Sequence, residues 1–266
     1  MAVIEKVSTE GVSELHRKLT RFLTDEPEVS IVVPAYNEEQ TLERLLRSMA
    51  SQITQYRTEL IIINNNSTDR TQDLLDQHGV RSVFVREQGV AHARQAGLMA
   101  ARGTYIANAD ADTIYPPTWL DALIGPLENV RISCTYGTYS FIPGPQTSAF
   151  QLTLYGQASR LAALMRRGSR ESTNVLGFNF AFRRADALAV GGFDVNAGHQ
   201  GVKNHTSGTC EDGWMAECLK QKGRLYPVSS HKARARTSDR RLLQHGGLWQ
   251  AFSKRFRREW KRLITH

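Results

Sequence analysis

Short apolar runs alternate with amphipathic stretches along the first 110 of the 266 residues. The apolar runs are continuous, which is typical of strands in a parallel sheet that is covered on both faces. The stretches between them carry apolar residues every three or four positions, which predicts helices. We expect strands at 29–36, 59–63, 82–85 and 103–110, and helices that begin near Asn37, at a cap formed by Ser67 or Thr68, and around Ala91.

This alternation predicts the fold class α/β, with a Rossmann-like, mainly parallel sheet flanked by helices. Ligands of such sheets bind outside the carboxyl ends of the strands. Three polar clusters follow predicted strands, at 34–36, 64–66 and 110–112. We therefore expect them to meet at one edge of the sheet.

The N-terminal segment predicts one more helix, which ends before residue 28. Its start lacks the charged, apolar and small-residue regions of a signal peptide, and the chain has no apolar run near the ~20 residues of a membrane-spanning helix. Three cysteines without CxxC spacing make a disulfide framework and a zinc site unlikely, and indicate a cytoplasmic protein. The helix is expected from the spacing of Val12, Leu15, Leu19, Phe22 and Leu23.

Basic residues concentrate at the C-terminus, and this distribution bears on which negatively charged partner the protein binds. The net charge is +8, and an aromatic stripe in 242–266 alternates with lysines and arginines. Such a basic amphipathic helix is typical of peripheral contact with an anionic membrane surface. The alternative is that the stripe packs on the main domain. No nucleic acid is expected, because no known binding module is visible. The stripe consists of Trp249, Phe252, Phe256, Trp260 and Leu263.

Asp110 and Asp112 are the leading candidates for chemistry. Residues i and i+2 of a strand point the same way, and carboxylate oxygens suit Mg²⁺ or Mn²⁺. The alternative is a solvated turn, since Asp is common in loops. Neither GxGxxG nor GxxxxGK[ST] follows the first strand, so a classical dinucleotide fold and a P-loop are poorly supported.

Six segments in order resemble family 2 glycosyltransferases with the GT-A fold, over about residues 29–241. The resemblance implies a metal-dependent transfer of a sugar from a nucleotide-sugar to a hydroxyl acceptor, usually with inversion. It divides the chain into an N-terminal helical extension (1–28), a nucleotide-binding half (29–115), an acceptor-binding half (116–241) and the basic helix (242–266). The segments are VSIVVPAYNEEQTLERLLRSM, IIINNNSTDRTQDLL, GVAHARQAGLMAARGTYIANADADT, GFNFAFRR, VGGFD and CEDGWMAECLKQKGRLY.

On the donor side, the resemblance makes Asp112 the direct metal ligand and places Asp110 at the ribose or the outer shell of the cation, Mn²⁺ or Mg²⁺. Asn64 stands where the family often has an Asp that accepts from uracil, so a UDP-sugar is favoured and a GDP-sugar stays open. Tyr36 is expected to stack on the base. The remaining residues expected around the nucleotide are Pro34, Ala35, Glu38, Arg94, Ala111, Arg240 and Arg241.

On the acceptor side, the resemblance makes Asp212 the general base, oriented by Glu211. Gly177 is expected to permit close approach, and Asn179 and Trp214 to contact substrate. His231 is a candidate further metal ligand, and 196–209 a candidate flap. The acceptor implied is a glycan or a lipid-linked saccharide.

Two other functions share parts of this pattern. A nucleotidyltransferase would use the same sheet edge and metal carboxylates, but the missing glycine-rich phosphate loop and the Glu-Asp segment count against it. A non-catalytic module that binds nucleotide or glycan would keep the fold, but the intact Asp110, Asp112 and Asp212 count against it.

Overall fold

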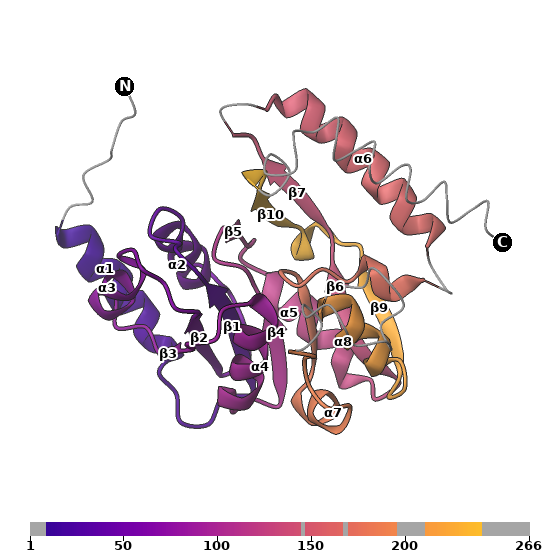
Figure 1. Cartoon of the computed structure of the whole chain (residues 1–266), viewed down its shortest axis with the longest axis horizontal. Coiled ribbons are helices and arrows are strands. Elements are labelled where there is room, and N and C mark those ends of the chain that lie inside the picture. Colours follow the sequence, from indigo (N-terminus) through magenta and orange to yellow (C-terminus); the bar gives the residue numbers. More distant parts are fainter. Residues whose placement is uncertain (1–8, 145–146, 167–169, 196–210, 241–266) are drawn as a thin grey trace.

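One seven-stranded sheet forms the centre of the computed structural model, which describes residues 9–144, 147–166, 170–195 and 211–240 (Figure 1). β8 runs antiparallel to both of its neighbours, and the other adjacent pairs are parallel. The carboxyl ends of the remaining strands therefore meet at one edge. In order across the sheet, the strands are β3 (Ser82–Phe84), β2 (Thr58–Asn64), β1 (Val29–Ala35), β4 (Tyr105–Asn108), β8 (Phe180–Arg183), β6 (Ile132–Gly137) and β9 (Arg224–Val228).

Helices cover both faces of this sheet, as the continuous apolar strands predict. One core lies between the sheet and α1, α2 and α5, and a second lies between the sheet and α4, α7 and α8. The expected α/β fold with a mainly parallel sheet is confirmed. None of the helices that the structure describes combines the length and the apolar character needed to cross a bilayer. The helices are α1 (Thr9–Leu19), α2 (Leu42–Ala50), α3 (Thr71–Gln77), α4 (Val90–Ala100), α5 (Trp119–Ile124), α6 (Ala149–Met165), α7 (Arg184–Ala189) and α8 (Glu211–Leu219), and the 3-10 turns are η1 (Thr20–Phe22), η2 (Gly125–Glu128), η3 (Glu171–Asn174) and η4 (His231–Ala233).

A smaller sheet connects the segment after Asp112 to the end of the described chain. In it, β10 (Ala235–Ser238) lies between β5 (Thr113–Ile114) and β7 (Tyr139–Ile142). The hydroxyls of Thr113 and Thr237 are hydrogen-bonded at 2.9 Å. Two segments more than 100 residues apart in sequence thus lie side by side next to the acidic motif.

Two predicted helix starts are wrong, and the cause is a turn that links both loops. Asn37 has a left-handed φ of 54°, and its side-chain oxygen accepts from the Thr68 amide at 2.8 Å. The first helix therefore begins only at Leu42. The second begins at Thr71, and neither Ser67 nor Thr68 caps it.

A glycine ends α3, and α1 is the helix that the spacing of apolar residues at the N-terminus predicts. Gly79 follows α3 with φ of 62°, as expected of a glycine that ends a helix. The predicted N-terminal helix is present, with Leu15, Leu19 and Phe22 buried. Leu23 is the exception, because it follows the 3-10 turn η1 and is 60% exposed.

A buried carboxylate stabilises the edge of the sheet opposite the polar clusters. Glu59 on β2 is fully buried and accepts hydrogen bonds from Ser30 at 2.7 Å and from Arg81 at 2.5 Å. Arg102 donates to it through both its backbone amide and its side chain. Burial alone would raise the pKa of Glu59, but these hydrogen bonds and cations outweigh burial and hold the pKa below its usual value.

Candidate active site

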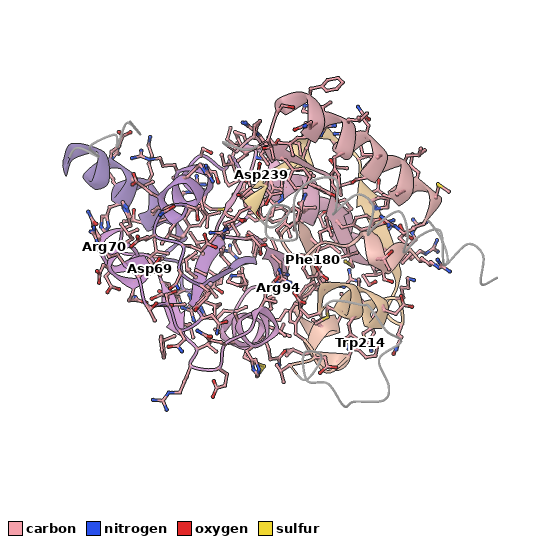
Figure 2. The ribbon with its side chains drawn as sticks, turned by 45° about the horizontal axis from the view of Figure 1, so that its top comes forward. Asp69, Arg70, Arg94, Phe180, Trp214 and Asp239 are labelled. Carbon is pink, nitrogen blue, oxygen red and sulfur yellow. The ribbon has the colours of Figure 1, made fainter. Side chains whose placement is uncertain are left out.

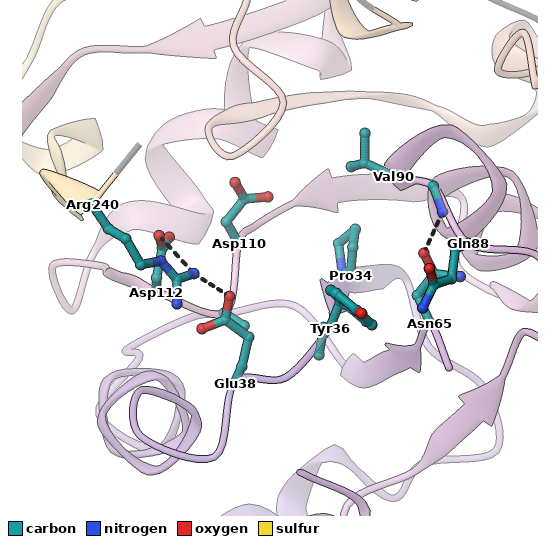
Figure 3. Close-up of a pocket in the computed structure, with 12 residues that line it drawn as sticks. Pro34, Tyr36, Glu38, Asn65, Gln88, Val90, Asp110, Asp112 and Arg240 are labelled. Atoms are coloured by element: carbon teal, nitrogen blue, oxygen red, sulfur yellow. Dashed lines mark hydrogen bonds and ion pairs between the residues drawn. The ribbon is translucent and has the colours of Figure 1, made fainter. Parts of the chain in front are cut away.

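A cavity of about 350 Å³ opens at the carboxyl ends of β1 and β4 (Figure 3). This is the edge at which open parallel sheets bind ligands. Most of the residues expected around a nucleotide line it, although they come from distant parts of the chain. Those lining residues are Pro34, Ala35, Tyr36, Glu38, Asp110, Ala111, Asp112 and Arg240.

Asn65 lines the cavity, and Asn64, the residue expected there, does not. Asn64 is 3% exposed, and its amide donates to Gln72 at 2.8 Å and accepts from the Ser67 backbone at 3.0 Å. Successive residues at a strand end point to opposite sides, and this alternation was the available signal. Asn65, rather than Asn64, therefore lines the cavity.

The loop after β3 forms a wall that the sequence did not predict. Gln88, Gly89 and Val90 line the cavity there. Asn65 holds this loop, because its Nδ2 donates to the Glu87 carbonyl at 2.6 Å and its Oδ1 accepts from the Gly89 amide at 2.8 Å. One side chain thus shapes the cavity and lines it.

The two carboxylates of the acidic motif are nearly buried, and a buried tyrosine hydroxyl holds the backbone amide of Asp110. Asp110 is 4% exposed and Asp112 is 3% exposed. The Tyr115 hydroxyl accepts from the Asp110 amide at 2.9 Å and donates to the Phe178 carbonyl at 2.8 Å. Burial raises the pKa of Tyr115 well above its usual value, so its hydroxyl stays protonated at neutral pH and retains this donor. The alternative of a solvated turn is excluded by this burial.

Arg240 closes one side of the cavity. Its guanidinium forms an ion pair with Glu38 and lies 3.7 Å from Asp112 Oδ2 (Figure 3). The side chain is 44% exposed, so it is accessible from the cavity mouth. Arg241 lies outside the described residues. His231 begins η4, is exposed and does not belong to the cavity lining.

Arg94 is neither solvated nor part of the cavity lining. Its side chain is 2% exposed and lies near the middle of the molecule (Figure 2). Nη2 is 3.2 Å from Asp110 Oδ1, and Nη1 is 2.5 Å from Glu211 Oε1. Arg94 thereby connects the acidic motif after β4 to the acidic pair that begins α8. Sequence gave no sign of this connection, because the paired residues are 117 positions apart.

Glu211 and Asp212 share this buried network. Burial raises the pKa of Glu211, Arg94 opposes that effect, and the charge of Asp212 adds to it. Asp212 is 7% exposed, and its two carboxylate oxygens accept from the backbone amides of Gly177 at 2.5 Å and Gly213 at 2.7 Å. The carboxylate is therefore held in one orientation by backbone donors.

Gly177 permits a close approach, as predicted, but the group that approaches is Arg94. A Cβ atom at this position would lie 1.9 Å from Arg94 Nη2. A side chain there would displace the guanidinium that joins the two acidic motifs. The glycine is thus required by the network.

Asn179 and Trp214, the expected substrate contacts, do not belong to the lining of the cavity at β1 and β4. Asn179 is 1% exposed; its Oδ1 accepts from Trp119 Nε1 at 2.8 Å, and its Nδ2 donates to the Thr138 and Ala233 carbonyls at 2.7 and 3.0 Å. Its amide is therefore used in internal hydrogen bonds, and its contact with substrate stays a prediction. Trp214 lines a separate cavity of about 380 Å³ beside Gln95 and Phe193. The predicted flap, 196–209, lies outside the described residues.

The donor set of the cavity fits a hard divalent cation that is held partly by substrate. Among the described residues, no group of three or more His, Cys, Asp or Glu side chains is arranged to hold a metal. Asp110 and Asp112 nevertheless place carboxylates on one wall. Mg²⁺ commonly takes one or two protein carboxylates and completes its shell with water and phosphate oxygens. The residues present therefore fit a cation that binds together with a diphosphate.

Known proteins share this sequence pattern and this fold. YdaM of Bacillus subtilis (strain 168), a probable glycosyltransferase, is 26% identical over 187 residues, which are 64% of this chain and 44% of YdaM. This chain thus spans less than half of that relative. The mannosyltransferase PcManGT from Pyrobaculum calidifontis, solved with GDP-Man and Mn²⁺, superposes with a TM-score of 0.58 at 19% identity, over 92% of this chain and 72% of that one. Glucosyl-3-phosphoglycerate synthase from Mycobacterium tuberculosis, solved with Mn²⁺, UDP-glucose and phosphoglyceric acid, gives 0.51 at 21% identity, over 82% and 74%.

These superpositions confirm the expected GT-A fold, with the basic C-terminal helix lying outside the described residues. The sequence model of Glycosyl transferase family 2 matches residues 30–190, more than half of the chain. This range contains the end of β1 and the loops after β2 and β4, from which Pro34, Asn65 and the acidic motif line the cavity. The chain therefore belongs to glycosyl transferase family 2.

Proposed function

We propose that this chain transfers a sugar from a nucleoside diphosphate donor to a hydroxyl group of a saccharide or lipid-linked acceptor, with a divalent cation and with inversion. One observation carries the proposal. The cavity wall that bears Asp110 and Asp112 is joined through the buried Arg94 to the pair Glu211 and Asp212. Donor-side and acceptor-side carboxylates thus belong to one rigid network.

The cavity is the proposed donor site. Asp112, with Asp110 beside it, would hold Mn²⁺ or Mg²⁺, and the cation would neutralise charge that develops on the leaving diphosphate. Arg240 is placed to exchange its contacts with Glu38 and Asp112 for the diphosphate oxygens when donor and cation enter. Tyr36, 48% exposed in the lining, offers its ring to the base.

The base is proposed to be uracil, with guanine as the other candidate. Asn65 lines the cavity, and its amide already bonds to the Glu87 carbonyl and the Gly89 amide, so the choice of base rests on the family resemblance of the segment around Asn64. The solved relatives carry GDP-Man in one case and UDP-glucose in the other. A nucleotide comparison is therefore part of the test below.

Asp212 is the proposed general base, and Glu211 is proposed to position it. A base must lie within hydrogen-bond reach of the proton that it removes and must be ionised. The amides of Gly177 and Gly213 donate to the two oxygens of Asp212 and fix its direction. A single base that removes the acceptor proton during in-line attack leads to inversion, because no covalent intermediate forms.

Thermal denaturation with UDP, GDP, CDP or dTDP, each with and without Mn²⁺, tests the donor site. We expect one nucleotide to raise the melting temperature only with Mn²⁺, and Asp112→Asn to abolish this shift. Asp73→Asn, an exposed Asp on α3, is the charge-matched control and should keep it. A folded wild-type protein that responds to no nucleotide would refute the proposal.

Asp212→Asn tests the acceptor half. Loss of a general base slows the chemical step by about 10²–10⁴-fold, measured as nucleotide release from the donor that the first assay identifies. The variant should retain the Mn²⁺-dependent thermal shift. Equal turnover by Asp212→Asn and the wild type would exclude Asp212 as the base, whereas a wild type that shows the thermal shift but no turnover would favour a binding module.

Peripheral membrane contact through 242–266 stays a prediction, because this segment lies outside the described residues. Co-sedimentation with anionic vesicles measures it directly. A chain ending at residue 241 should bind them less than the full chain does.

A further inference from the structure

A further cavity, of about 300 Å³, lies at the same edge of the sheet as the proposed donor cavity. It is called the second cavity below and differs from the cavity beside Trp214. It opens at the carboxyl ends of β6 and β9, which are parallel to each other. The first turns after these strands line it, and α6 forms its outer wall (Figure 1). Of the described residues that line the two cavities, none is shared. The fold thus offers two separate places for ligands at one edge.

Two arginines line this second cavity, Arg160 from α6 and Arg234 after η4. Neither forms any of the ion pairs found in the described part of the chain. Arg234 Nε and Thr138 Oγ1 are buried, and no described atom bonds to them. Buried polar atoms without partners are rare in native proteins, and an unfilled ligand site is one physical reason for them. Guanidinium groups match phosphate oxygens in a two-pronged geometry.

The neighbouring polar groups leave a positive balance. Glu171 is the acidic side chain beside the cavity, and the Tyr136 hydroxyl donates to it at 2.8 Å. Asn174 accepts from Arg166 at 2.9 Å and donates to the Ala163 carbonyl at 2.9 Å, so its amide belongs to the wall. Two arginines would repel a bound cation here, whereas a bound anion would form ion pairs with them.

The walls of the second cavity contact the segments that hold Asp212. The Thr138 carbonyl in its wall accepts from Asn179 Nδ2 at 2.7 Å. Asn179 is two residues from Gly177, whose amide holds the Asp212 carboxylate. The 3-10 turn η3, which contributes Asn174 to the wall, packs against α8. The cavity and the proposed base are therefore joined by two short structural paths.

The outer face of α6 is unusually apolar. Its inner face packs through Leu152 and Tyr155, whose ring lies 5.8 Å from Phe141 on β7. Arg160 is the single charged residue within α6. The outer apolar side chains, each between 54% and 78% exposed, are Phe150, Leu154, Leu161, Leu164 and Met165. Leu164 also lines the second cavity, so an apolar surface continues into a basic cavity.

We propose that Arg160 and Arg234 bind a phosphate ester carried by the acceptor. The inference rests on the proposed transfer function and deepens it by naming the chemical class of the acceptor. The phosphate ester can come from a free, water-soluble acceptor or from a lipid head group. The outer face of α6 suits the lipid source, since apolar chains can lie along it while the phosphate enters the cavity.

Binding without nucleotide and with EDTA tests the second cavity alone, because the donor cavity then lacks its cation. The soluble probe is glycerol 3-phosphate, measured by calorimetry. The lipid probe is phosphatidylcholine vesicles containing phosphatidic acid, measured by co-sedimentation against phosphatidylcholine vesicles given the same charge by phosphatidylserine, so that attraction of the basic segment 242–266 to an anionic surface is the same in both. One variant combines Arg160→Gln with Arg234→Gln. A second combines Arg160→Lys with Arg234→Lys, which keeps the charge and removes the planar guanidinium that can donate two parallel hydrogen bonds. Arg224→Gln, at the other end of β9, is exposed and serves as the charge-matched control.

We expect the double Gln variant to bind the responsive probe at least tenfold more weakly, the double Lys variant to fall between, and Arg224→Gln to match the wild type. A response to glycerol 3-phosphate identifies a free phosphate ester, and a response to vesicles alone identifies a lipid phosphate. Equal binding by the double Gln variant and the wild type, equal loss in Arg224→Gln, or no binding of either probe to the wild type overturns the proposal.

The Mn²⁺-dependent shift with nucleotide separates this result from the donor proposal. It should persist in the double Gln variant, which also shows that the variant is folded. Loss of the shift in the wild type concerns the donor proposal alone.

Discussion

Replacing Arg94 by Met removes the cation that joins the two acidic motifs while keeping a side chain of similar length. Arg94 contacts Glu211 at 2.5 Å and Asp110 at 3.2 Å, and the three side chains are 2%, 15% and 6% exposed. The substitution leaves two buried carboxylates without their shared partner. We expect the folded state to lose stability and the cavity wall to lose its fixed geometry.

The size of the loss follows from opposing effects. At an effective dielectric constant of about 20, each contact near 3 Å is worth about 5 kcal/mol. Burying the guanidinium offsets much of that gain, and removing one partner of a buried pair costs about 3–5 kcal/mol in practice. We therefore expect Arg94→Met to lower the free energy of unfolding by about 3–5 kcal/mol at pH 8.

The loss should depend on pH in a defined direction. Burial raises the pKa of Glu211 above its usual 4.5, and Arg94 opposes the rise. A carboxyl with a raised pKa in the folded state binds more protons when folded, so stability falls as pH rises from 4.5 to the folded pKa. Without Arg94 this pKa rises further and the window extends to higher pH. The deficit of Arg94→Met should therefore be smallest near pH 5 and largest near pH 8.

Urea denaturation at pH 5 and pH 8 measures this deficit. Arg47→Met is the control, because Arg47 contacts Glu43 at the same 2.5 Å but the two side chains are 52% and 25% exposed. Such a surface pair is worth about 1 kcal/mol or less. Adding Glu211→Gln to Arg94→Met should recover part of the loss. A deficit equal to that of Arg47→Met, one independent of pH, or a double variant no more stable than Arg94→Met would refute the reasoning.

Three further substitutions have defined outcomes. Gly177→Ala should cost about 1–3 kcal/mol by overpacking against Arg94, whereas Gly156→Ala, with no atom within 4 Å of its Cβ, should gain up to about 1 kcal/mol in helix α6; urea midpoints compare them. Asn179→Leu should cost about 3 kcal/mol or more through three lost hydrogen bonds and still show the Mn²⁺-dependent nucleotide shift; loss of that shift in a folded variant would indicate a donor contact. Glu59→Gln should destabilise the protein at pH 7, and because the folded pKa of Glu59 is lowered, the difference should shrink as pH falls below 4.5; a difference constant from pH 7 to 3.5 would contradict this.

Local chemistry determined the fold class and the residues that gather at the cavity of β1 and β4. The apolar runs of β1 and β2 are buried along their length, so their pattern carried the information that a covered parallel strand needs. Polar residues directly after these strands had to meet at one edge, because parallel strands end together. That argument located Tyr36, Asp110 and Asp112 correctly in one cavity.

The partners of these residues depended on tertiary structure. Arg94 could be predicted on a helix, but its burial between Asp110 and Glu211 depends on how α4 and α8 pack on the same face of the sheet. Asn179 follows the motif that suggested a sugar contact, yet its amide is used by Trp119 and by two carbonyls from distant segments. Sequence determines which groups can donate, accept or carry charge. Only the packed chain decides which of them are already satisfied, because hydrogen bonds and ion pairs between distant segments form only when the fold brings those segments together.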